Sequence, residues 1–135
     1  IARLSEEKGH IYLIKAMQEV IVKFPQAQLI IVGEGRMRKK LVSLTQAEGL
    51  ERSVFFLPPV MDTQEILSCM DLFVLPSLKE GLGLALMEAM ASGLGVIGSD
   101  VGGIRSLIQD RYNGLLVRPA DIRGLSDKIL PGRKQ

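Results

Sequence analysis

Two glutamates flank a glycine-containing stretch in the middle of the chain, where residues 80–88 read EGLGLALME. Glycine lets a ligand approach the backbone closely, and amides at the start of a helix favour anions. Helical side chains tilt toward the helix N-terminus, so we expect Glu88 to reach back to the loop that carries Glu80. Carboxylates accept hydrogen bonds from sugar hydroxyls and amides suit phosphate, which predicts a nucleotide-sugar site. The competing interpretation is a glycine turn with two solvated glutamates.

A basic pair, Arg3 and Lys8, lies near the start of the chain. If a strand ends near Ile1, both residues occupy the loop between that strand and the first helix. Arginine offers a planar fork of donors and lysine a compact charge, and the two together suit a diphosphate. The alternative is a solvated loop in which Glu6 and Glu7 neutralise the two cations.

A second glycine pair, in Gly33-Glu34-Gly35, begins like a dinucleotide fingerprint, but Arg38 stands where the third glycine belongs. The signal for a nicotinamide-type cofactor is therefore weak. Residues 36–40 then place four positive charges at a helix start, against the helix dipole. A solvated basic face is favoured over binding of an anion or an acidic membrane surface.

Three further features of the sequence are interpreted mainly as structural. Gly102-Gly103 is expected to form a flexible turn after a strand, either as a plain turn or facing a ligand. His10 is expected to be an exposed or capping residue at the first helix. Met87 and Met90 are expected to fill the core under a helix that packs on the sheet.

Alternating apolar periods predict the elements that must position these residues. Short buried strands are expected at 29–32, 54–56, 72–75, 96–97 and 115–117, and helices at 11–24, 37–48, 62–70, 84–92 and from Asp121 onward. Alternating strands and helices imply an α/β fold, a Rossmann-like parallel sheet sandwiched by helices. Ligands bind at the carboxyl ends of such strands, which points to the loops 33–36, 58–62, 76–83 and 98–103.

Composition limits the chemistry. The 135 residues predict one domain, 1–135, and 47% hydrophobic residues exclude wholesale disorder. A net charge of +2 does not by itself indicate nucleic-acid binding. With one cysteine, Cys69, and one histidine, His10, the chain cannot build a disulfide or a His/Cys metal cluster. The sequence starts without methionine and in mid-pattern, so we expect a partner domain on its N-terminal side.

Together these motifs resemble the C-terminal domain of retaining glycosyltransferases with the GT-B fold, group 1 or family 4. The strongest element is the pair Glu80 and Glu88 with seven residues between them, inside EGLGLALMEAMASG. Around it, in the family's order, stand RLSEEKG, IVGEG, DLFVLPS, SDVGGI and NGLLV. The resemblance runs from Arg3 to about Ile129.

The resemblance implies roles for four charged residues. Arg3 and Lys8 match the family's basic pair on the donor diphosphate, and would lower the barrier by stabilising the departing diphosphate. Glu80 matches the carboxylate that contacts hydroxyls of the transferred sugar. Glu88 matches the carboxylate on the ribose.

The resemblance also implies backbone contacts. Gly33 lies in a loop of the donor site, and Val60 falls where the family's backbone meets the nucleobase. The loop that holds sugar and phosphates corresponds to Gly81, Leu82, Gly83 and Leu84. Three positions depart from the family's usual residues: Leu82 replaces Phe, Gly95 replaces Pro and Ala2 replaces Gly.

For the whole enzyme, the resemblance implies transfer with retention from a UDP-, GDP- or ADP-sugar, without a metal or other cofactor. The acceptor, a sugar or a lipid-linked glycan, would bind mainly to the missing N-terminal domain. This chain alone is then expected to bind donor weakly and to catalyse nothing. A cytoplasmic enzyme is expected, with peripheral membrane association as an option and no nucleic-acid partner.

Three other functions stay open at this point. The domain could be a nucleotide-binding or regulatory module of the same fold without a transfer role. A glycosidase could use Glu80 and Glu88 as acid and base, but this leaves Arg3, Lys8 and the glycine loop unexplained. A dehydrogenase is the weakest alternative, because its fingerprint is incomplete.

Overall fold

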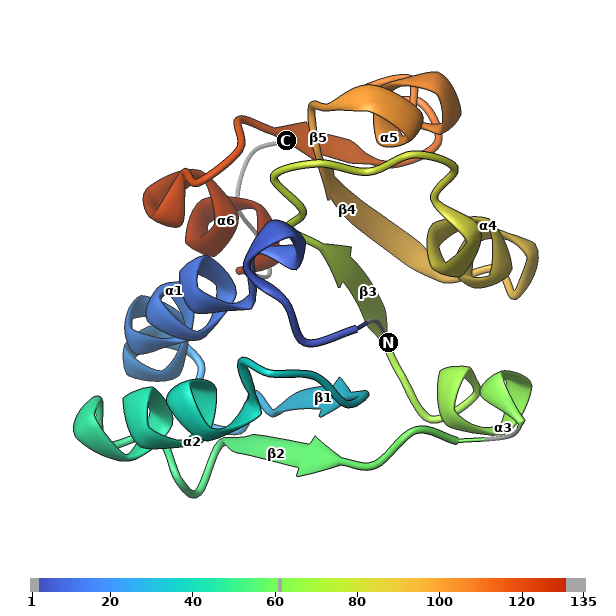
Figure 1. Cartoon of the computed structure of the whole chain (residues 1–135). Helices are drawn as coiled ribbons and strands as arrows, with labels where there is room; N and C mark the ends of the chain where they lie inside the picture. Colours follow the sequence, from blue (N-terminus) through green and yellow to red (C-terminus); the bar gives the residue numbers. More distant parts are fainter. Residues whose placement is uncertain (1–2, 61, 131–135) are drawn as a thin grey trace.

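The computed structural model describes residues 3–60 and 62–130, in which strands and helices alternate along the chain (Figure 1). The strands are β1 (Leu29–Val32), β2 (Val54–Leu57), β3 (Leu72–Leu75), β4 (Gly95–Ser99) and β5 (Leu115–Val117). The helices are the short 3-10 helix η1 (Glu6–Lys8), α1 (His10–Lys23), α2 (Arg38–Ala47), α3 (Thr63–Leu67), α4 (Leu84–Ala91), α5 (Gly102–Leu107) and α6 (Ile122–Ile129).

All strand pairs are parallel, which confirms the predicted Rossmann-like α/β class. The strands form two sheets, one of order β1-β2 and one of order β3-β4-β5. The expected single sheet is thus divided, because no described strand bridges the facing edges of β1 and β3. The expected strand ending near Ile1 lies outside the described residues.

Two of the apolar clusters hold helices α1 and α4 on the sheets. Ile14 and Met17 of α1 pack with Ile31 of β1, while Leu86 of α4 packs with Phe73 of β3. Burying an aliphatic or aromatic side chain of this size contributes about 1.5–3 kcal/mol. Helix α4 is therefore anchored on β3 and β4. The loop between β3 and α4 is thus attached at both ends to packed elements.

Two aspartates cap helices that the sequence predicts. The Asp62 carboxylate accepts hydrogen bonds from the amides of Gln64 and Glu65 at 3.1 and 3.4 Å. The Asp121 carboxylate accepts one from the Gly124 amide at 2.9 Å. Side-chain acceptors at this position satisfy amides that have no partner inside the helix. Helix α3 ends at Leu67, earlier than the predicted Met70.

Two expectations were wrong. Gly102 and Gly103 begin helix α5 instead of forming a flexible turn, because buried Ile104 anchors that helix in the core. Met87 is 37% exposed, whereas Met90 packs against the apolar cluster as predicted. Within the described residues, no helix combines the length and hydropathy that crossing a membrane requires.

The expectation of an exposed His10 is also wrong. Gly9 adopts the left-handed conformation, with φ of 70°, and turns the chain from η1 into α1. This turn places His10 at the inward-facing start of α1, where it is only 7% exposed. Burial, with added repulsion from the Lys8 charge, lowers the pKa of His10 from 6.5 to about 4.

The buried histidine predicts a pH-dependent stability. Between pH 6.5 and pH 4 the unfolded chain binds a proton on His10 that the folded chain excludes, so the free energy of unfolding falls as the pH is lowered. We expect the protein to lose about 2 kcal/mol more between pH 7 and pH 5 than the His10→Gln variant, which stays neutral. Urea denaturation at both pH values measures this; equal losses would contradict it.

Candidate functional site

A cavity of about 590 Å³ opens beyond the carboxyl end of β3, where the segment before α1 meets the loop between β3 and α4. It brings together Arg3, Lys8 and Glu80, three of the residues that the sequence singled out. The complete lining consists of Arg3, Ser5, Glu7, Lys8, Leu75, Glu80, Leu82, Gly83, Leu84 and Ala85. Both signs of charge therefore face one cavity, next to the start of a helix.

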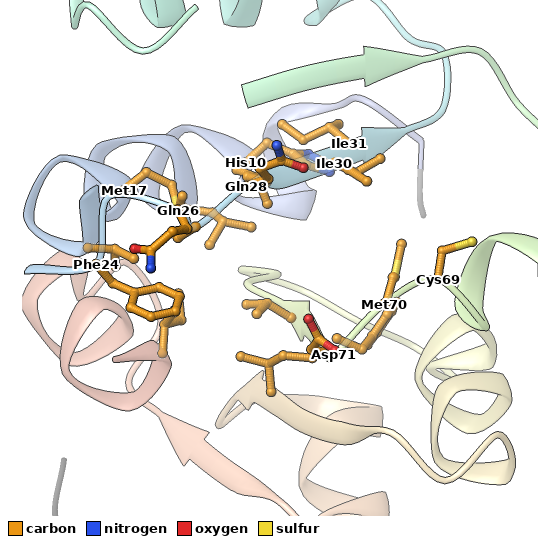
Figure 2. A pocket seen from close by; sticks show the side chains of 18 residues that line it. His10, Met17, Phe24, Gln26, Gln28, Ile30, Ile31, Cys69, Met70 and Asp71 are labelled. Carbon is orange, nitrogen blue, oxygen red and sulfur yellow. The ribbon is translucent and has the colours of Figure 1, made fainter. Parts of the chain in front are cut away.

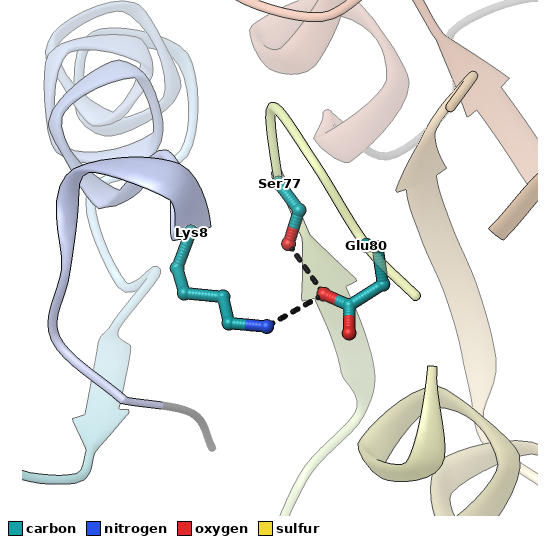
Figure 3. A network of polar contacts seen from close by, with 3 residues as sticks. All are labelled: Lys8, Ser77 and Glu80. Atoms are coloured by element: carbon teal, nitrogen blue, oxygen red, sulfur yellow. Dashed lines mark hydrogen bonds and ion pairs between the residues drawn. The ribbon is translucent and has the colours of Figure 1, made fainter. Parts of the chain in front are cut away.

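The two charges most enclosed in this cavity are paired. Lys8 Nζ donates to Glu80 Oε1 at 2.9 Å, and the hydroxyl of Ser77 donates to the same oxygen at 2.9 Å (Figure 3). The Lys8 side chain is 22% exposed and the Glu80 side chain 12% exposed. Partial burial strengthens such a contact compared with a solvated pair. Glu80 is thus held in one orientation by two donors.

The main chain joins the segments that carry the pair. The amides of Leu78 and Lys79 donate to the Glu7 carbonyl at 2.7 and 3.4 Å. Gly9 packs directly on the Pro76 carbonyl, where a β-carbon would collide. The residue after Lys8 must therefore be glycine for the η1 segment to lie this close to the loop after β3.

Helix α5 supports the same loop from its other side. The Gly103 amide donates to the Glu80 carbonyl at 2.8 Å. A β-carbon on Gly102 would collide with the Glu80 carbonyl, and one on Gly103 with the Gly81 carbonyl. The two glycines thus act as a close contact surface for the Glu80 loop.

The start of α4 faces the cavity with its backbone. Gly83 is the N-cap and has φ of 70°, a conformation in which a side chain is strained. The side chains of Leu82 and Leu84 are 71% and 62% exposed. The first amides of a helix have no partner within it and favour negative charge, so this end of α4 suits a phosphate or a sugar oxygen.

The second glutamate does not join the first. Glu88 is exposed on α4, does not line the cavity, and accepts a hydrogen bond from the Thr63 hydroxyl of α3 at 2.5 Å. The expectation that it reaches back to the Glu80 loop is thus wrong, because its carboxylate is directed to α3. Glu88 and Thr63 thus form a separate polar contact between α3 and α4.

Three further residues of the predicted site lie outside the cavity. Gly81 is exposed in the loop itself. Gly33 is buried after β1 and its amide donates to the Leu57 carbonyl at 3.0 Å. Val60 follows β2 and is 36% exposed; residue 61 lies outside the described residues. The basic residues at 36–40 are exposed, with Arg36 next to Glu6 at 3.6 Å.

Sequence reasoning missed Ser77 and Thr63, the two hydroxyl donors to the glutamates. Ser77 directly follows the β3 strand and its Pro76, a position where a polar residue faces the carboxyl end of the sheet. Thr63 had no such signal, because only the packing of α3 beside α4 brings it to Glu88. Over the residues that the structure describes, no three His, Cys, Asp or Glu side chains are grouped to hold a metal ion.

Comparison with known proteins gives one consistent family. A model of the family described as glycosyl transferases group 1 matches residues 1–131. A UDP-Gal:alpha-D-GlcNAc-diphosphoundecaprenol alpha-1,3-galactosyltransferase of Escherichia coli is 33% identical over 96% of this chain and 36% of its own length. A GDP-mannose-dependent monoacylated alpha-(1-6)-phosphatidylinositol monomannoside mannosyltransferase of Corynebacterium glutamicum is 36% identical over 96% of this chain and 35% of its own.

Comparison with solved structures agrees with the family match. Anabaena Alr3699/HepE in complex with UDP-glucose superposes with a TM-score of 0.87 at 31% identity, covering 93% of this chain and 35% of that one. The C-terminal domain of the group 1 glycosyl transferase LpcC from Francisella tularensis gives a TM-score of 0.85 at 31% identity, covering 96% and 70%. The chain thus spans about a third of the length of the curated relatives it matches.

The contact between α5 and the Glu80 loop yields a prediction. We expect Gly103→Ala to reduce the free energy of unfolding by about 1–3 kcal/mol, because the new methyl group meets the Gly81 carbonyl. Gly81→Ala is the matched control in the same loop, since a β-carbon there meets nothing within 4 Å. Thermal or urea unfolding of both variants measures the difference. Equal stabilities would contradict the prediction, because they would show that the Glu80 loop moves away from the new methyl group at no cost in free energy.

Proposed function

Because the chain belongs to the group 1 glycosyl transferases, we propose that it is the donor-binding domain of an enzyme that transfers a sugar from a nucleotide-sugar to an acceptor. The observation that carries the proposal is the cavity in which Arg3, Lys8 and Glu80 meet the N-terminus of α4. The activity of the whole enzyme is part of the proposal, since this chain spans about a third of its relatives.

The diphosphate is proposed to lie between the basic residues and the start of α4. Arg3 can bind two phosphate oxygens with its planar fork, and Lys8 adds a compact charge. The amides of Leu82, Gly83 and Leu84 supply neutral donors at the positive end of the helix. This arrangement stabilises the charge that develops on the diphosphate as its bond to the sugar breaks.

Glu80 is proposed to hold the transferred sugar. Its Oε1 already accepts from Lys8 and Ser77, so Oε2 is the oxygen that can accept from a sugar hydroxyl (Figure 3). Ser77 and Lys8 therefore position the carboxylate before the donor arrives, which lowers the entropic cost of binding. Its neighbour Gly81, in the same loop, allows close approach of the ligand.

The nucleoside is proposed to extend from this cavity toward α3. Glu88 accepts from the ribose hydroxyls, with Thr63 fixing the carboxylate from behind. Val60 offers its backbone to the nucleobase, and Gly33 keeps the loop after β1 compact on the same edge of the domain. A base read by main-chain groups leaves UDP-, GDP- and ADP-sugars as candidate donors, and the names of the relatives include both UDP-Gal and GDP-mannose.

The reaction is proposed to retain the anomeric configuration and to need no metal or other cofactor. The acceptor hydroxyl replaces the diphosphate on the same face of the sugar, and its proton leaves with the diphosphate. Arg3, Lys8 and the α4 amides supply the positive charge that a metal ion supplies elsewhere. The acceptor, a sugar or a lipid-linked glycan, binds mainly outside this chain, in a cytoplasmic enzyme that can lie on a membrane surface.

Removing either cation tests donor binding in the full-length protein. We expect Arg3→Ala and Lys8→Met each to weaken binding of the nucleotide-sugar by about tenfold or more, the usual effect of losing a charge-assisted hydrogen bond. Lys39→Ala, an exposed cation at the start of α2, is the matched control and should leave affinity unchanged. Calorimetric titration measures the affinity of all three variants. An equal loss of affinity in Lys39→Ala would show that binding depends on the net charge of the protein and not on contacts with Arg3 and Lys8.

Product analysis tests the reaction. We expect the full-length enzyme to give only the anomer of the donor sugar, read by proton NMR coupling at the anomeric position. Activity should persist after dialysis against EDTA, since the proposed charge stabilisation uses side chains and amides. Inversion of the anomer, or activity lost to EDTA and restored by a divalent cation, would refute the corresponding part of the mechanism.

A further inference from the structure

The cavity at the start of α4 has a lining without net charge, although the ligand proposed for it is an anion. Its charged residues are two cations, Arg3 and Lys8, and two carboxylates, Glu7 and Glu80. A site that only had to attract a diphosphate would gain from cations alone, because a carboxylate placed beside a phosphate costs free energy. The carboxylates therefore need a function of their own.

The two carboxylates differ in how strongly an anion in the cavity senses them. Glu80 has a side chain that is only 12% exposed, and its Oε1 lies 2.9 Å from Lys8 Nζ, whereas Glu7 is exposed. Water and salt screen a partly buried charge less than an exposed one. Glu80 is thus the carboxylate that acts most strongly on a ligand in this cavity.

The Glu80 carboxylate is fixed where an incoming anion meets it. The hydroxyl of Ser77, a fully buried residue, donates to the same Oε1 at 2.9 Å (Figure 3). The Gly103 amide holds the backbone carbonyl of Glu80 at 2.8 Å. Glu80 is therefore held by both its side chain and its main chain, and in the empty cavity it neutralises the charge of Lys8.

A nucleotide-sugar and a nucleoside diphosphate differ at the end that faces Glu80. The sugar of the donor brings hydroxyl groups, and one of them donates to Glu80 Oε2. After transfer, the diphosphate ends in a free phosphate, which carries an additional negative charge and has no sugar hydroxyl to donate. Carboxylate and phosphate then repel each other and compete for the charge of Lys8.

We propose that Glu80 is a specificity-determining residue that selects the nucleotide-sugar against the nucleoside diphosphate released by the reaction. Glu80 holds Lys8 while the cavity is empty and accepts from the sugar while the donor is bound. Once the sugar has left, its charge opposes the new terminal phosphate and favours departure of the product. The inference rests on the proposed function and adds to it a role for the pair of Lys8 and Glu80 in product release.

A second cavity offers no comparable site for such an anion. It has a volume of about 370 Å³, and Figure 2 shows it between Ile30 and Ile31 of β1 and Met70 and Asp71 at the start of β3. No lysine or arginine stands among the described residues that line it. His10 lines it too, but with its pKa lowered to about 4 this side chain is neutral at pH 7. Binding of a nucleoside diphosphate therefore reports on the cavity at the start of α4.

Calorimetric titration of the full-length protein with UDP, GDP and ADP tests the inference. Glu80→Gln keeps the size of the side chain and an oxygen for Ser77 and Lys8, but it removes the charge. We expect this variant to bind the nucleoside diphosphate of the preferred base about tenfold more tightly than the unchanged protein. A variant that only disturbed the cavity would bind more weakly, so the gain in affinity is specific to the proposed role.

Glu7→Gln is the matched control, because it removes the same charge from an exposed position in the same lining. We expect it to change the affinity by less than about twofold, as solvent screens an exposed charge. Unchanged or weaker binding by Glu80→Gln, or an equal gain in Glu7→Gln, would overturn the inference.

Arg3→Ala separates this inference from the proposed function. If Arg3→Ala weakens binding of the nucleoside diphosphate and Glu80→Gln brings no gain, the proposed function stands and the role of Glu80 in selection is overturned. If neither the unchanged protein nor Glu80→Gln binds UDP, GDP or ADP, both are overturned.

Discussion

The ion pair between Lys8 and Glu80 joins the first described segment to the loop after β3, two parts of the chain 72 residues apart. The loop between β3 and α4 has no regular structure of its own, so its shape depends on such contacts. Ser77 shares the Glu80 oxygen, and the Glu7 carbonyl accepts the backbone amides of Leu78 and Lys79. The cavity exists because these contacts hold the two segments together.

Close backbone approach is the second constraint. Gly9 lies against the Pro76 carbonyl, and Gly102 and Gly103 lie against the carbonyls of the Glu80 loop. A side chain at any of these positions would push the loop away from its support. The glycines that look like turn signals in the sequence are therefore contact surfaces, and they let α1 and α5 hold the Glu80 loop from two sides.

Local signals explain what could be predicted from the sequence. The apolar run at 29–32 and the capping aspartates Asp62 and Asp121 act within a few residues, and the structure has the strand and both caps. The burial of His10 and the direction of Glu88 depend on packing between distant elements, and both predictions were wrong. Arg3, Lys8 and Glu80 were found because carboxyl ends of parallel strands meet at one edge.

The most direct test of the account is a titration of the full-length protein with UDP-, GDP- and ADP-sugars, followed by protein-observed NMR, with NAD as the control. The account predicts that one nucleotide class shifts the signals of Lys8, Glu80 and residues 82–84, and that NAD leaves them unchanged. Shifts confined to the basic face at 36–40, or equal shifts with NAD, would contradict it. Either result would show that the cavity at the start of α4 is not a nucleotide-sugar site.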